Sequence, residues 1–60
     1  MKSKEIKTLR KKLKLTQKGL AEQVGVDQVT VNRWENEARK PSRMAVRQLE
    51  RLMRKGNDGS

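Results

Sequence analysis

Apolar residues recur along the chain at intervals of three and four residues, the spacing that places side chains on one face of an α-helix. The first stretch carries Ile6, Leu9 and Leu13, with Ser3 placed to cap a helix and Glu5 in its first turn. The same spacing recurs in three later segments: residues 17–24, 28–36 and 43–55. No segment alternates apolar and polar residues with the period of two that indicates a β-strand. The pattern therefore predicts an all-α chain of four short helices.

Residues that favour helix ends separate these segments. Thr16 and Asp27 are suited to cap the second and third helices. Gly25, between them, can adopt the left-handed conformation in which helices commonly end. Pro41 disfavours helix in the residue before it, and Ser42 is suited to cap the fourth helix. These residues predict short connections and a longer loop over 36–42.

The chain is short enough for one small domain. Gly56 is expected to end the fourth helix, so that a single domain spans residues 3–55. Residues 56–60 are then expected to form a frayed C-terminal tail.

The window 17–36 meets the steric requirements of two helices that cross through a tight turn. Ala21 is small enough for the closest approach of the helices, and Gly25 can provide the turn. Apolar side chains are placed to pack around the crossing: Leu20, Val24, Val26, Val31 and Trp34. This combination indicates a helix-turn-helix, with Trp34 in the core rather than stacked on a base.

Charge and composition narrow the classes of function. Sixteen Lys and Arg residues stand against seven Asp and Glu, a formal net charge of +9, which favours an anionic partner, nucleic acid first. The chain contains no Cys and no His, so we expect no disulfide, metal or cofactor and no catalytic residue. No apolar stretch is long enough for a membrane span or a signal peptide, which makes the cytoplasm the expected location.

The chain resembles the phage-repressor, Cro-like (XRE-type) helix-turn-helix family. The resemblance extends from about residue 6 to residue 52 and is carried by Leu9-Arg10, Leu15-Thr16-Gln17, Leu20-Ala21, Val24-Gly25-Val26, Val31-Asn32-Arg33-Trp34-Glu35 and Pro41. It implies a compact, lambda-repressor-like bundle of four or five short helices. It also implies that the helix over about 28–35 is a recognition helix, which lies in the major groove of DNA.

The resemblance and the side-chain chemistry together give candidate DNA contacts. Asn and Gln can pair with adenine, Arg with guanine, and Val can contact a thymine methyl group. The candidate base-reading residues are Gln28, Val29, Asn32 and Arg33. Val29 also has the plainer interpretation of an isolated apolar residue on the surface.

Phosphate contacts are expected from Gln17, Asn36, Arg39, Lys40 and Arg43. For other basic residues we favour a solvated surface: Lys2, Lys4, Lys7, Arg51 and Arg54. In the family a pair such as Arg10 and Glu35 forms a partly buried ion pair that ties the first helix to the third, so both are interpreted mainly as structural. Gly19, inside the second helix, departs from the family pattern and is expected to cost about 1 kcal/mol relative to Ala.

The expected function is sequence-specific binding of double-stranded DNA by a transcriptional regulator, most simply a repressor. A homodimer on an operator with two-fold symmetry is the expected assembly, associated with the nucleoid when bound. A narrower alternative is the antitoxin of a toxin–antitoxin pair, with a toxin as second partner. Another is a protein-interaction module that kept the fold without DNA binding. A basic helix lying on a membrane surface is a weaker alternative, because Gly25 and Pro41 favour a globule.

Overall fold

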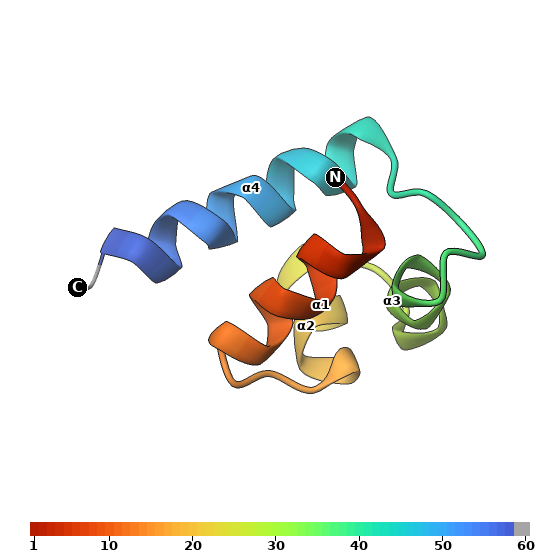
Figure 1. The fold of residues 1–60 in the computed structure, drawn as a ribbon, viewed down its shortest axis with the longest axis horizontal. Coiled ribbons are helices and arrows are strands. Elements are labelled where there is room, and N and C mark those ends of the chain that lie inside the picture. Colours follow the sequence, from red (N-terminus) through yellow and green to blue (C-terminus); the bar gives the residue numbers. More distant parts are fainter. Residues whose placement is uncertain (59–60) are drawn as a thin grey trace.

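Four α-helices build the domain in a computed structural model that describes residues 1–58 (Figure 1). The helices are α1 (Ser3–Lys12), α2 (Gln17–Val24), α3 (Gln28–Glu35) and α4 (Arg43–Asp58). The described residues contain no strand. The predicted all-α fold of four short helices is therefore confirmed.

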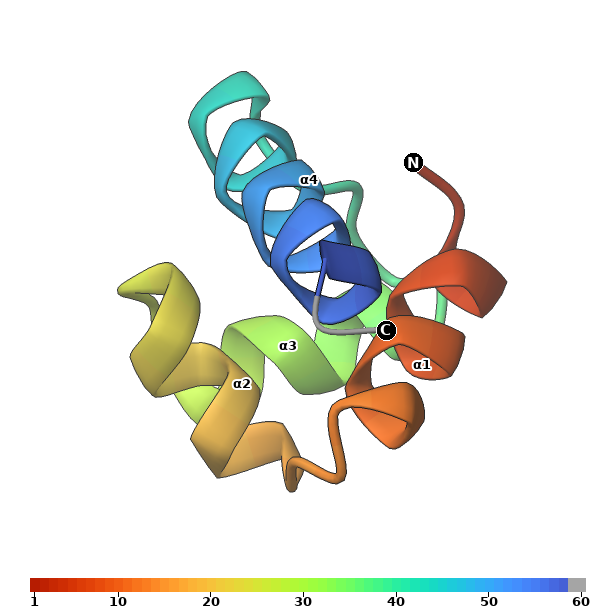
Figure 2. The same cartoon turned by 90° about the vertical axis from the view of Figure 1, so that its left-hand side faces the viewer.

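The helices surround one small core. Figure 2 shows α4 lying over the other helices, with α1 and α2 on either side of α3. α3 packs against both α1 and α2, and α4 packs against the same two helices. The core side chains come from all four helices: Ile6, Leu9, Leu20, Ala21, Val31, Trp34, Ala45 and Leu49. Trp34 lies in this core, as its spacing from Val31 predicts.

The starts of α2, α3 and α4 lie where the sequence predicts them. The Thr16 hydroxyl oxygen accepts a hydrogen bond from the Gly19 backbone N–H at 3.0 Å, and the Ser42 hydroxyl oxygen accepts one from the Ala45 N–H at 3.2 Å. Each bond satisfies a backbone donor that the helix itself leaves free. Asp27 occupies the N-cap position of α3, but its side chain makes no capping hydrogen bond. Its carboxylate is therefore free to contact a partner.

Three predicted helix ends are wrong by one to three residues: α3 ends at Glu35 rather than at residue 36, and the start of α1 and the end of α4 also differ. Ser3 is the first residue of α1 rather than its cap, and Lys2 occupies the N-cap position. The backbone N–H of Lys2 donates to Glu5 Oε1 at 3.3 Å, so the glutamate supplies the end contact. α4 continues through Gly56 to Asp58, because glycine weakens a helix without requiring it to end. The rest of the predicted tail, residues 59 and 60, lies outside the described residues.

The turn between α2 and α3 has the predicted geometry. Gly25 has φ +87° and ψ 34°, in the left-handed region. Its N–H donates to Ala21 O at 2.8 Å, and the Val26 N–H donates to the same oxygen at 2.9 Å. Ala21 is only 2% exposed, as expected for the small residue at the crossing of two helices. This turn sets the angle at which α3 leaves α2.

Gly19 is explained by its close neighbours in the first turn of α2. A Cβ atom at this position would lie 3.3 Å from Thr16 Oγ1 and 3.4 Å from Leu15 Cδ2. The first of these atoms belongs to the residue that caps α2. An alanine would gain in helix propensity and crowd the cap, so the expected cost of glycine is offset here.

Candidate nucleic-acid interface

One face of α3 is exposed while the other is buried in the core. Val31 and Trp34 face inward, and the side chains of the four candidate base-reading residues are exposed: Gln28, Val29, Asn32 and Arg33. Val29 is 58% exposed. The face therefore combines two amides, a guanidinium group and an apolar side chain on one helix.

A chain of side-chain hydrogen bonds joins this face to the interior. Asn36 Nδ2 donates to Asn32 Oδ1 at 3.0 Å, and Asn32 Nδ2 donates to Gln17 Oε1 at 3.3 Å. Gln17 Nε2 in turn donates to Glu35 Oε1 at 3.3 Å. We call these four residues the amide chain. The sequence predicts that each of them lies near the DNA or in the ion pair. It does not predict the hydrogen bonds between them, because these depend on how α2 crosses α3.

The amide chain ends at an ion pair between α1 and α3, the pair expected from the sequence. Arg10 Nε donates to Glu35 Oε2 at 2.6 Å, and Arg10 Nη2 donates to Glu35 Oε1 at 3.1 Å. Arg10 Nη1 also donates to the Leu15 carbonyl oxygen at 3.1 Å, which holds the connection into α2. The side chain of Glu35 is 2% exposed and that of Arg10 is 17% exposed. One guanidinium group thus joins α1, the start of α2 and α3.

The neighbours of Glu35 keep it ionised. Burial raises the pKa of its carboxyl, but hydrogen bonds from Arg10 and Gln17, with the charges of Arg10 and Lys7, outweigh burial and hold the pKa below its ordinary value. The hydrogen bond to Glu35 likewise raises the pKa of Arg10 against the opposing effect of burial. The pair is therefore charged at neutral pH.

The candidate phosphate contacts gather after α3. Asn36, Arg39 and Lys40 lie in the loop between α3 and α4 (Figure 1), and Arg43 begins α4; all four are exposed. Gln17, the fifth candidate, is half-buried and already tied into the amide chain.

The loop after α3 is held against the end of that helix. The N–H groups of Ala38 and Arg39 both donate to the Arg33 carbonyl oxygen, at 2.9 and 3.3 Å. Glu37 adopts φ +61° to make this turn, a conformation uncommon for residues other than glycine. Nothing in the sequence predicted a left-handed residue here, because no glycine or asparagine stands at this position.

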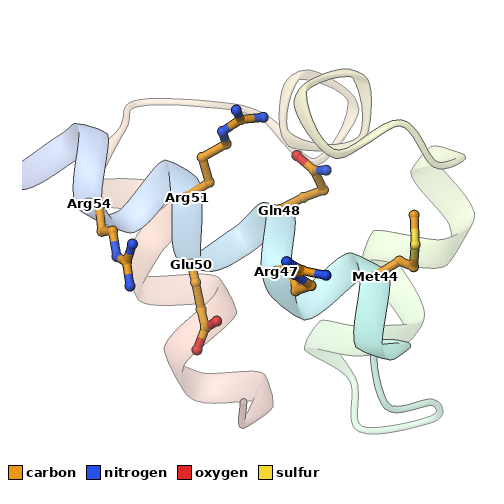
Figure 3. Close-up of a pocket in the computed structure, with 6 residues that line it drawn as sticks. All are labelled: Met44, Arg47, Gln48, Glu50, Arg51 and Arg54. Carbon is orange, nitrogen blue, oxygen red and sulfur yellow. The ribbon is translucent and has the colours of Figure 1, made fainter.

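A second basic surface follows the outer face of α4. Figure 3 shows Arg47, Arg51 and Arg54 on this helix. With Met44, Gln48 and Glu50 they line a shallow groove of about 510 Å³. All six side chains come from one helix, so the groove is the space between long side chains rather than an enclosed cavity. The outer face of α4 therefore remains a solvated basic surface.

Two other kinds of site are absent from the part of the chain that the structure describes. No three His, Cys, Asp or Glu side chains are grouped so that they could bind a metal ion. No helix is both long and apolar enough to pass through a bilayer.

Comparison with known proteins shows a match to a protein family. A family model described as helix-turn-helix matches residues 6–56, which is most of the chain. Neither the curated proteins nor the solved structures include a significant match. The matched range begins at the first core residue of α1 and includes α2, the turn, α3 and most of α4.

Proposed function

The chain belongs to the XRE-type helix-turn-helix family, and on this basis we propose that it reads a specific double-stranded DNA sequence with α3 and represses transcription. The family consists of DNA-binding regulatory domains rather than enzymes. The observation that carries the proposal is the exposed face of α3, where Asn32 and Arg33 can pair with base edges and Val29 can contact a thymine methyl group. An exposed apolar side chain beside the exposed polar side chains of Gln28, Asn32 and Arg33 adds nothing to solubility and is useful against that methyl group.

The loop after α3 is proposed to hold the DNA backbone. Arg39, Lys40 and Arg43 are exposed within eight residues of the end of α3, where they can contact phosphates beside the groove. Asn36 and the first turn of α2, at Gln17, would add neutral hydrogen bonds to the same backbone. These contacts supply affinity and orientation, and α3 supplies sequence preference.

A homodimer on a symmetric operator is the proposed assembly. Two copies would place their α3 helices in successive major grooves, with half-sites roughly 34–36 Å apart. An antitoxin role would add a toxin as partner. A toxin-like reading frame beside the gene would support that narrower role.

Selection from a random duplex library tests the proposal most directly. We expect the protein to enrich one sequence with two-fold symmetry and half-sites one helical turn apart. Failure to enrich any sequence would contradict DNA reading. An enriched site without symmetry would contradict the dimer alone.

A protein-interaction module is the second candidate function, and Asp27 is the observation that favours it. This carboxylate is exposed at the start of α3 and makes no capping hydrogen bond, so it would repel a nearby phosphate. DNA binding ranks higher for two reasons. The same carboxylate can accept a hydrogen bond from cytosine N4. The net charge of +9 also outweighs the repulsion between one carboxylate and the DNA.

Replacing Arg33 with Ala should weaken binding to the selected site by about 1–3 kcal/mol and relax the preference at one base pair. The expected cause is the loss of paired hydrogen bonds to guanine. Affinities measured for the selected site and for its three variants at that base pair provide the check. Arg54→Ala, which removes an exposed guanidinium group on α4, is the matched control and should leave the preference unchanged. Equal losses in the two variants would contradict base reading by Arg33.

A further inference from the structure

The amide chain gives Asn32 a fixed orientation before any DNA is present. We propose that Glu35 and Gln17 are positioning residues, which hold the Asn32 amide so that it reads adenine. This inference rests on the proposed function and assigns one base of its target. It is carried by the direction of each hydrogen bond in the chain.

The direction is set at the buried end, because an ionised carboxylate can only accept hydrogen bonds. Both oxygens of Glu35 accept from Arg10, and Oε1 also accepts from Gln17 Nε2. The amide of Gln17 must therefore turn its NH₂ group towards Glu35. A reversed amide would place two acceptors against each other beside a side chain that is 2% exposed.

Each later bond follows from the first. With its NH₂ group facing Glu35, Gln17 presents Oε1 to α3, where Asn32 Nδ2 donates to it. Asn32 Oδ1 then faces Asn36, whose Nδ2 donates. Reversing any one of these amides would place two donors or two acceptors together. The buried charge thus determines the orientation of an exposed side chain.

The orientation leaves Asn32 with the groups that adenine requires. An amide has two N–H donors and two acceptor lone pairs. Asn32 uses one donor towards Gln17 and one lone pair towards Asn36, which leaves one of each. The major-groove edge of adenine offers an acceptor at N7 and a donor at N6. Because the orientation is already fixed in the free protein, binding does not have to order this side chain.

The positioning role can be separated from a phosphate contact by Gln17. A phosphate contact raises affinity for every sequence alike. A positioning role affects the protein's preference at a single base pair. That base pair is the one at which Asn32→Ala abolishes the preference. The test uses the selected duplex and its three variants at that base pair, and the full chain throughout.

In the wild-type protein we expect a preference for adenine of roughly 5- to 150-fold at this base pair. Gln17→Met keeps the length of the side chain and removes both of its hydrogen bonds. It should reduce that preference by about two- to tenfold, the net value of one hydrogen bond, and leave the preference for the Arg33 base unchanged. Lys18→Met, an exposed neighbour on α2, is the matched control and should not change either preference.

A second measurement needs no DNA. The side-chain NH₂ signals of Asn32 in nitrogen-15 NMR spectra should shift in Gln17→Met and exchange faster with solvent, and should stay in place in Lys18→Met. Trp34 fluorescence confirms that each variant is folded. A Gln17→Met protein with full adenine preference, or with unchanged Asn32 signals, would overturn the positioning role. A wild-type protein that selects no site would instead contradict the proposed function itself.

Discussion

Replacing Arg10 with Met should lower the free energy of unfolding by about 3 kcal/mol or more, because the carboxylate of Glu35 would be left buried without its partner. The substitution also removes the bond to the Leu15 carbonyl oxygen. A domain of this size has a total stability of about 3–9 kcal/mol. The substitution should therefore remove about a third or more of the total stability.

Urea or thermal unfolding followed by circular dichroism and Trp34 fluorescence measures this loss. Lys11→Met, which changes an exposed residue next to Arg10 on α1, is the matched control and should change stability by less than about 0.5 kcal/mol. The free energy of unfolding of Arg10→Lys should lie between those of Arg10→Met and Lys11→Met. Lysine keeps the positive charge but loses the planar group that makes two hydrogen bonds to the carboxylate. Equal stability of Arg10→Met and Lys11→Met would show that the ion pair contributes nothing to the fold.

The same pair predicts the response of stability to acid. The pKa of Glu35 is lower in the folded protein than its ordinary value, which is about 4.3 in an unfolded chain. Its contribution is therefore present above that value and is lost as the pH falls through the lower folded pKa. The wild-type protein should lose stability on acidification over this range. In an Arg10→Met variant, where only the hydrogen bond from Gln17 and the charge of Lys7 still oppose the effect of burial on Glu35, the dependence should weaken or reverse.

Affinity for a single half-site should fall about a thousandfold between 50 and 200 mM salt, if about five or six phosphates are neutralised there, because the release of counterions then gives a slope near −5 for log affinity against log salt concentration. This dependence of affinity on salt would come from the three cations that follow α3, namely Arg39, Lys40 and Arg43, and from other basic residues near the DNA. Titrations of a duplex that carries one half-site of the selected sequence, at several salt concentrations, measure the slope. A slope close to zero would contradict an interface based on phosphate contacts.

Arg39→Ala should weaken binding to all sequences about equally and make the slope shallower by about one. Arg39 is exposed in the loop that is bonded to the end of α3, which holds it near the DNA backbone in the proposed complex. Arg54→Ala is again the control, because it removes the same charge from the outer face of α4. If the two variants change the slope by the same amount, the cations act through net charge and not through placed contacts.

Short-range signals predicted much of the fold. Thr16, Gly25 and Ser42 act as the sequence indicates because caps and left-handed turns depend on neighbouring residues. Apolar spacing likewise identified the inward positions of α3. The exact end of α4 could not be predicted, since helix packing decides whether a glycine ends a helix or is tolerated within it.

The site was predictable as a set of residues and not as a connected unit. The exposed positions of α3 follow from its buried ones. The bond between Gln17 and Asn32 depends on the separation of α2 and α3 at their crossing, which no local pattern records. The turn at Glu37 was missed for a related reason: the carbonyl oxygen of Arg33 accepts two N–H groups, and this compensates for an unfavourable backbone conformation.

The amide chain also has a consequence for how such a protein can change its target over evolutionary time. Positions 17, 32 and 36 share hydrogen bonds, so a substitution at one of them alters the environment of the other two. Arg33 takes no part in these side-chain bonds. A new operator is therefore more easily reached by single changes at Arg33, whereas a new base opposite Asn32 requires coordinated changes on α2 and α3.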